Sequence, residues 1–101
     1  MSAARYDFTA ELWLHEGQAA WTFVTLPGDV SDDIEARTAD RSIAFGSVRV
    51  HVAVGRTEWN TSLFPDNNAQ AYLLPVRKEV RRAELLNVGD EVALSLLVLD
   101  A

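Results

Sequence analysis

Four cations dominate one short stretch of the chain. Arg77, Lys78, Arg81 and Arg82 are four of its nine lysines and arginines, and Glu79 is the only acid among them. On a helix, residues spaced by one, four and five positions share one side. Such a cluster could bind a phosphate or another small anion, or the acidic surface of a partner. The simpler interpretation, which we favour, is a solvated helix face whose cations pair weakly with nearby carboxylates.

A second candidate is His51, which stands two residues after Arg49 in an alternating stretch. A histidine beside an arginine can bind a carboxylate or act as a general acid. A histidine that simply faces solvent is the commoner case, so we assign no catalytic residue. The other histidine, His15, has only Glu16 as a neighbouring ligand, which is too few for a metal. We therefore expect no metal and no cofactor.

A third candidate is apolar. Strand alternation places Trp13, Leu97 and Leu99 on outward faces. Apolar patches on small domains often mark partner surfaces, so we expect these side chains, with Arg49 and His51, to contact a ligand or partner. The apolar three would form a self-association surface or dock a helix, unless the chain's own helices cover them. Four other aromatic side chains are expected in the core: Phe8, Trp21, Phe23 and Trp59.

Composition limits the classes of partner and chemistry. The chain has 101 residues, 49% of them hydrophobic, which fits a single globular domain over residues 1–101. Its net charge is −6, so we expect no attraction to nucleic acid or to an anionic membrane. No apolar run is long enough to span a membrane, and no secretory signal is recognisable. The lack of cysteine excludes disulfides and thiolate chemistry and, with the missing signal, indicates a cytoplasmic protein.

Short strands must position these candidate residues. Six stretches alternate apolar and polar residues or are rich in strand-forming types, namely residues 6–14, 19–26, 43–54, 57–63, 69–76 and 91–100. Two further stretches, 30–39 and 77–86, have helical spacing, and the basic cluster lies on the second. Pro75, near the end of the fifth strand, indicates a sheet edge or a strand terminus.

The fold class follows from this order of elements. Six short strands with one apolar face each can bury that face by closing on themselves. We therefore expect a mostly β fold, a small closed six-stranded β-barrel with two short helices that cap its ends. Closure would also remove exposed sheet edges.

The order of several motifs resembles that of a known family across residues 6–99. The motifs are WTFVTLP at 21–27, GSV at 46–48, WNTSLFP at 59–65, YLLPVRK at 72–78 and LNVGDEV at 86–92. Together they resemble a family of small bacterial domains of unknown function, whose members are sometimes followed by a bacteriocin-protection-type (YdeI/OmpD-associated) domain. The resemblance implies a closed six-stranded barrel with two helices. It implies no reaction and no catalytic residues.

Two classes of function remain open. The first is a non-catalytic binding or interaction module, which could act as a homo-oligomer or with a protein partner. The alternative is an enzyme or small-ligand protein that handles an anionic compound through Arg77, Arg81, Arg82 and His51. Gathering of these side chains around one concave pocket would favour the alternative. Dispersal over a convex surface would favour the module.

Overall fold

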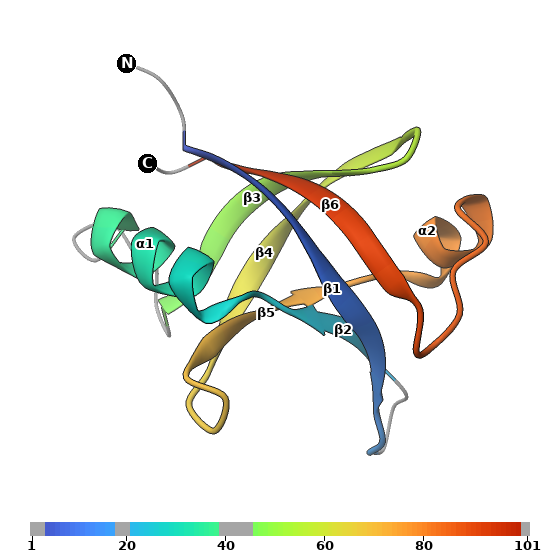
Figure 1. Cartoon of the computed structure of the whole chain (residues 1–101), viewed down its shortest axis with the longest axis horizontal. Helices are drawn as coiled ribbons and strands as arrows, with labels where there is room; N and C mark the ends of the chain where they lie inside the picture. Colours follow the sequence, from blue (N-terminus) through green and yellow to red (C-terminus); the bar gives the residue numbers. More distant parts are fainter. Residues whose placement is uncertain (1–3, 18–20, 39–45, 100–101) are drawn as a thin grey trace.

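A computed structural model describes residues 4–17, 21–38 and 46–99 of the chain. It contains six strands and two helices, as the sequence predicts (Figure 1). The strands are β1 (Arg5–His15), β2 (Trp21–Thr25), β3 (Val48–Val54), β4 (Thr57–Asp66), β5 (Ala71–Pro75) and β6 (Glu91–Val98). The helices are α1 (Gly28–Thr38) and α2 (Lys78–Ala83).

The strands form a closed antiparallel barrel in the order β1-β2-β5-β4-β3-β6. The expected closed barrel is therefore confirmed. The first strand is the longest and pairs with two neighbours in succession. Its beginning lies against β6, from Arg5 opposite Leu97, and its end lies against β2, with Trp13 opposite Phe23. The register of β3 with β4 and β6 completes the ring.

Strand alternation decides which side chains fill the barrel. In β3 every second residue is a buried valine, from Val48 to Val54, while Arg49 and His51 point outward. The same period in β6 buries Val92, Leu94, Leu96 and Val98. Each fully buried aliphatic side chain contributes roughly 1.5–3 kcal/mol relative to an exposed one. These two strands therefore supply much of the stability of the fold.

The two helices lie on opposite sides of the barrel (Figure 1). On α1, Ile34 is fully buried, and the Ser31 hydroxyl accepts a hydrogen bond from the Tyr72 backbone N–H at 3.1 Å. On α2, Val80 is buried. The predicted second helix, residues 77–86, is too long at both ends. It stops at Ala83 because Leu85 adopts a left-handed backbone with φ of 54°, which a helix cannot contain.

Two aromatic residues of β2 are not in the core, contrary to the sequence interpretation. Trp21 is 52% exposed, and Phe23 is only partly buried. Because Thr22 and Val24 point into the barrel, alternation turns Trp21 and Phe23 outward. The expectation for Phe8 and Trp59 is confirmed, since both pack against the buried cluster.

Strand boundaries differ from the predicted ones by a few residues. The third strand begins at Val48, and the predicted start at residues 43–45 lies outside the described residues. The fifth strand ends at Pro75, so the predicted strand terminus is correct. Among the described helices, none is both long and apolar enough to cross a membrane.

Candidate binding groove

The barrel has a split between β4 and β5. The two strands pair only from Phe64 opposite Leu73 to Asp66 opposite Ala71. Beyond Leu73, β5 stays with β2, and the Val76 backbone N–H donates to the Thr22 carbonyl at 2.9 Å. Pro75 has no N–H with which to continue a ladder. The chain therefore leaves β4 at this point and turns into α2.

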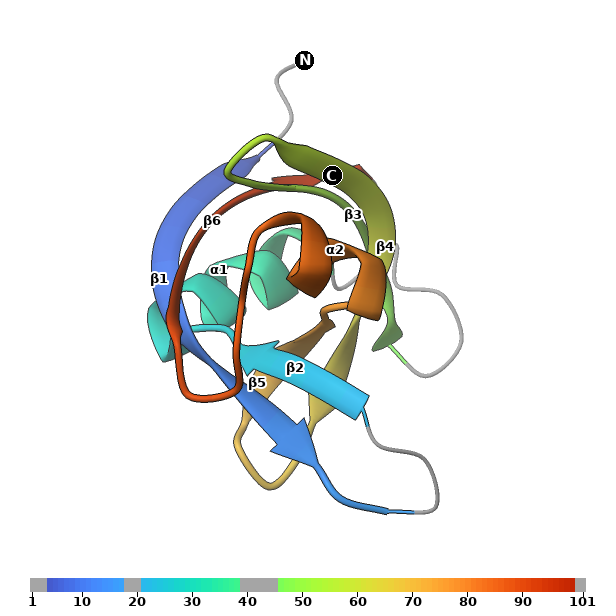
Figure 2. The same ribbon diagram turned by 90° about the vertical axis from the view of Figure 1, so that its right-hand side faces the viewer.

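A groove of about 600 Å³ occupies this split. Figure 2 shows α2 on the viewer's side of the barrel, with β2 and β5 below it. The groove is lined by residues of β2, β4, β5, α2 and the link between β5 and α2, which are Trp21, Thr22, Thr61, Phe64, Pro75, Val76, Arg77, Lys78, Glu79 and Arg81. Segments that are far apart in the sequence thus build one concave surface.

Three of the four predicted anion-binding residues share this groove. Arg77 stands immediately before α2, and Lys78 and Arg81 lie on the helix. Arg82 faces a neighbouring hollow of about 360 Å³, which Lys78 and Arg81 also line. The structure therefore brings Arg77, Lys78 and Arg81 together and places Arg82 at the margin.

Arg81 differs from the other cations of the cluster. Arg77, Lys78 and Arg82 are exposed, whereas Arg81 is half-buried. Its Nε atom is buried and has no hydrogen-bond partner among the described residues. A buried donor without an acceptor costs about 1–3 kcal/mol.

Two exposed aromatic rings form the apolar part of the groove. Trp21 is 52% exposed and Phe64 is 46% exposed. The Trp21 ring stacks on Phe23 with a centroid distance of 6.2 Å and an interplanar angle of 12°. Phe23 in turn lies 5.4 Å from the Trp13 ring, whose Nε1 donates to the Thr25 hydroxyl at 2.9 Å. The aromatic surface therefore continues from the groove across β2 to β1.

Sequence reasoning missed Trp21 and Phe64 as site residues. The outward position of Phe64 could have been predicted, since it follows Leu63, which is buried, and alternation then turns Phe64 outward. The outward position of Trp21 could not, because both faces of β2 carry strand-forming residues and nothing local identifies the inner face.

His51 lies at a different site, on the outer surface of β3. Its Nε2 lies 2.8 Å from Oε1 of Glu58, and its Nδ1 lies 2.6 Å from Oδ1 of Asn60. Hydrogen bonds to Glu58 and then to Asn60 raise the pKa of His51 above its usual value. The hollow beside it, about 280 Å³, also contains Arg5 and Leu97 and shares no lining residue with the groove.

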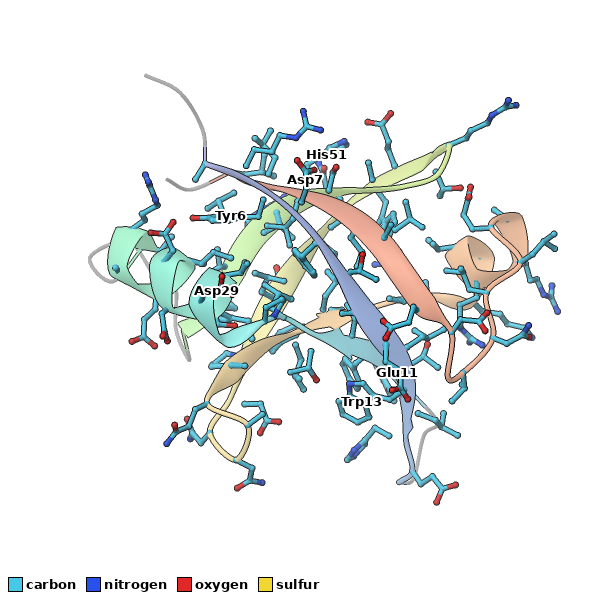
Figure 3. The ribbon with its side chains drawn as sticks, in the orientation of Figure 1. Tyr6, Asp7, Glu11, Trp13, Asp29 and His51 are labelled. Carbon is cyan, nitrogen blue, oxygen red and sulfur yellow. The ribbon has the colours of Figure 1, made fainter. Side chains whose placement is uncertain are left out.

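The apolar candidates do not form one patch. Leu97 lies opposite Arg5 at the start of β1, whereas Trp13 stands eight residues further along the same strand. Eight residues of strand span roughly 26 Å. Figure 3 shows Trp13 and Glu11 far from Asp7 and His51. Leu97 is partly buried beside His51, and Leu99 is 42% exposed.

Arg49 is exposed on the same strand as His51, and its backbone carbonyl accepts a hydrogen bond from the Leu99 N–H at 2.9 Å. Arg49 and Leu99 therefore lie with Leu97 and His51 at the meeting of β3 and β6, away from the groove. Within the described ranges, no three histidine, aspartate or glutamate residues are placed to share a metal ion.

Comparison with known proteins identifies a family of domains of unknown function. A family model described as a domain of unknown function (DUF1905) matches residues 8–96. No curated protein matches the chain.

Proposed function

The chain belongs to the DUF1905 family, and from its geometry we propose that it is a non-catalytic binding module for an anionic ligand with an apolar part. The observation that carries this proposal is the groove itself, where Arg77, Lys78 and Arg81 meet the exposed rings of Trp21 and Phe64. The ligand would place its charge on the cations and its apolar part on the rings.

Electrostatics supports an anion at this position. Residues 77–82 carry four cations and one acid, a net charge of +3, so the rest of the chain carries −9 (−6 minus +3). A carboxylate or phosphate oxygen 4 Å from one cation gains about 4 kcal/mol at an effective dielectric of 20. Glu79 also lines the groove and opposes a highly charged ligand. A ligand with one or a few negative charges is the best match.

The composition of the groove favours binding over catalysis. The described residues that line it include no histidine, and their polar side-chain groups are two hydroxyls, the Trp21 indole N–H, three cations and Glu79. His51, the candidate general acid, has both ring nitrogens engaged and lines a separate hollow. The enzyme alternative therefore lacks its acid at the place where the cations lie.

The compartment and source of the protein are part of the same proposal. The lack of cysteine fits a reducing compartment, so we place the module in the bacterial cytoplasm. A net charge of −6 suits a protein that stays dispersed unless a specific partner binds.

Phenyl phosphate, an anion with one aromatic ring, is a minimal probe. We expect amide resonances of residues 21–22, 61–64 and 76–81 to shift when the ¹⁵N-labelled chain is titrated with it. The K78Q/R81Q variant should bind it at least about tenfold more weakly, because two charge-assisted contacts are lost. R56Q is the matched control, since Arg56 is exposed and lies outside the groove. Shifts confined to the surroundings of His51, or equal weakening by both variants, would remove this function from the groove.

A further inference from the structure

The groove is bordered by a stretch of β4 that has no partner strand on one side among the described residues. From Val48 opposite Leu63 to Val54 opposite Thr57, β4 pairs with β3 on one side. On its other side, β5 pairs with β4 only from Phe64 onward. In the described part of the chain, no backbone hydrogen bond reaches that side from Glu58 to Leu63. Among the described residues, the barrel ladder therefore does not extend along this stretch.

The free stretch has fixed ends. At one end the Thr57 hydroxyl donates to the Glu84 carboxylate at 2.6 Å, which ties the strand to the segment after α2. At the other end Phe64 pairs with Leu73. Residues 58–63 span roughly 20 Å of strand, which is enough for a short peptide strand. Every second residue of such an edge presents its N–H and C=O outward.

The side chains around this edge indicate what could pair with it. Thr61 and Phe64 of β4 line the groove, and Trp21, Pro75 and Val76 face them. An added strand would place alternate side chains against these apolar groups. The other side chains, or one end of the strand, would reach Lys78 and Arg81.

Charge selects a protein segment over a nucleic acid. Three cations attract acidic groups, but Glu79 lies in the groove. Glu11, two residues before Trp13 on β1, is the ladder partner of Glu91, so two further acids lie near the aromatic rings. A polynucleotide carries a phosphate at every residue and would meet these acids. A peptide can place its few acids at the cations and uncharged residues elsewhere. The backbone of a peptide also supplies N–H and C=O groups that can pair with those of the edge.

We propose that the groove binds an extended, acidic segment of a partner protein, which adds as a strand to the edge of β4 at residues 58–63. This inference rests on the proposed function and specifies its ligand. The backbone of the segment would extend the β4 ladder. Its acidic side chains would contact Lys78 and Arg81, and its apolar side chains would cover Trp21 and Phe64.

The test uses two peptides with identical side chains. One is a short acetylated and amidated peptide in which aspartate alternates with phenylalanine. Its twin carries a methyl group on every backbone nitrogen, so it cannot donate to a sheet. Isothermal calorimetry on the full chain should give binding at least about tenfold weaker for the twin, because two or three backbone hydrogen bonds are lost. K78Q/R81Q should weaken the unmethylated peptide, and R56Q should not.

Hydrogen exchange gives an independent result. On binding of the unmethylated peptide, alternate amides of residues 58–63 should become protected. Equal binding of both peptides would overturn strand addition while leaving an anion-binding groove, and phenyl phosphate would then still bind. Failure of both peptides and of phenyl phosphate would overturn the proposed function as well.

The same measurements distinguish a partner peptide from two other possible occupants of the groove. Tighter binding of an oligodeoxythymidylate, with shifts in the groove, would overturn the peptide in favour of a single-stranded nucleic acid. Protection of the 58–63 amides that rises with protein concentration, without peptide, would overturn it in favour of a second copy of the chain.

Discussion

Glu84 accepts a hydrogen bond from the Thr57 hydroxyl, with 2.6 Å between the two oxygen atoms. The same carboxylate also accepts from the Arg56 backbone N–H at 3.3 Å. These contacts join the residue after α2 to the turn between β3 and β4. They fix the position of the helix that carries Lys78 and Arg81, so the geometry of the groove depends on them.

Replacing Glu84 with alanine should loosen this attachment. We expect E84A to lower the free energy of unfolding by about 1–2 kcal/mol, since the Thr57 hydroxyl loses its acceptor. Urea denaturation measures the change, and hydrogen exchange should show faster exchange in α2. E79A, on the exposed side of the same helix, is the control and should be nearly neutral. Equal losses in the two variants would show that Glu84 does not hold the helix.

A side chain at Gly55 should displace the Glu84 carboxylate from its position. Its φ of 57° lies in the left-handed region, and a Cβ there would collide with the Glu84 carboxylate. We expect G55A to be destabilised by more than the roughly 1–2 kcal/mol that a left-handed alanine costs. In the E84A background the collision disappears, so the same substitution should cost less. A double-mutant cycle in urea gives the difference, and strict additivity would contradict the collision.

Tyr6 should ionise at unusually high pH. Partial burial, followed by the hydrogen bond to Asp33 at 2.5 Å, raises the pKa of Tyr6 to about 12. Because the pKa is raised in the folded state, the stabilising contribution is complete below the unfolded pKa of about 10 and is lost as pH rises toward 12. Ultraviolet titration should show that D33N lowers the Tyr6 pKa. D32N, which replaces a neighbouring exposed acid, should leave the Tyr6 pKa unchanged.

His51 should remain protonated to a higher pH than a free histidine. Its hydrogen bonds to Glu58 and Asn60 raise its pKa, so its contribution to stability is present below about 6.5 and declines as pH rises through the folded value. NMR titration should place the His51 pKa lower in E58Q than in the parent. Glu58 is the acid and Arg5 the cation that line the hollow beside the ring. An unchanged pKa in E58Q would mean that the carboxylate does not contact the imidazole in solution.

Trp21 should contribute little to stability. Because the ring is half-exposed, we expect W21A to lower the free energy of unfolding by about 1 kcal/mol or less. The fully buried Leu74 provides the contrast, with about 2–5 kcal/mol expected for L74A. Urea denaturation of both variants measures the two losses. A large loss for W21A would support the original core assignment.

The sequence predicted the barrel because alternation was clear where it mattered most. In β3 a valine occupies every second position over the whole strand, so the buried face could be read directly. In β6 the alternate residues Val92, Leu94, Leu96 and Val98 indicated the buried face, although Ala93 and Leu97 on the other face are apolar too. The basic cluster was also readable, because its members are neighbours on one short helix. The assignment failed for Trp21 and Phe23, where neither face of the strand is polar.

The groove could not be predicted, since it depends on long-range contacts. It exists because Val76 bonds to Thr22, 54 positions away, instead of continuing beside β4. No local pattern encodes that choice. Pro75 indicated only a strand terminus or a sheet edge. That Trp13 and Leu97 lie far apart could be seen only once the register of β1 with β6 was known.

The pairing of β1 with β6 has a consequence for how the barrel folds. Asp7 and Ser95 are 88 positions apart in the chain, yet they are partners in the ladder and share a hydrogen bond. Closing a flexible loop of that length costs about 4 kcal/mol of chain entropy. Hairpins such as β3–β4 join residues that are far closer together in the sequence. The seam between the first and last strands should therefore form late, and a circularised chain with Arg5 and Leu97 tethered should fold faster without any new contact.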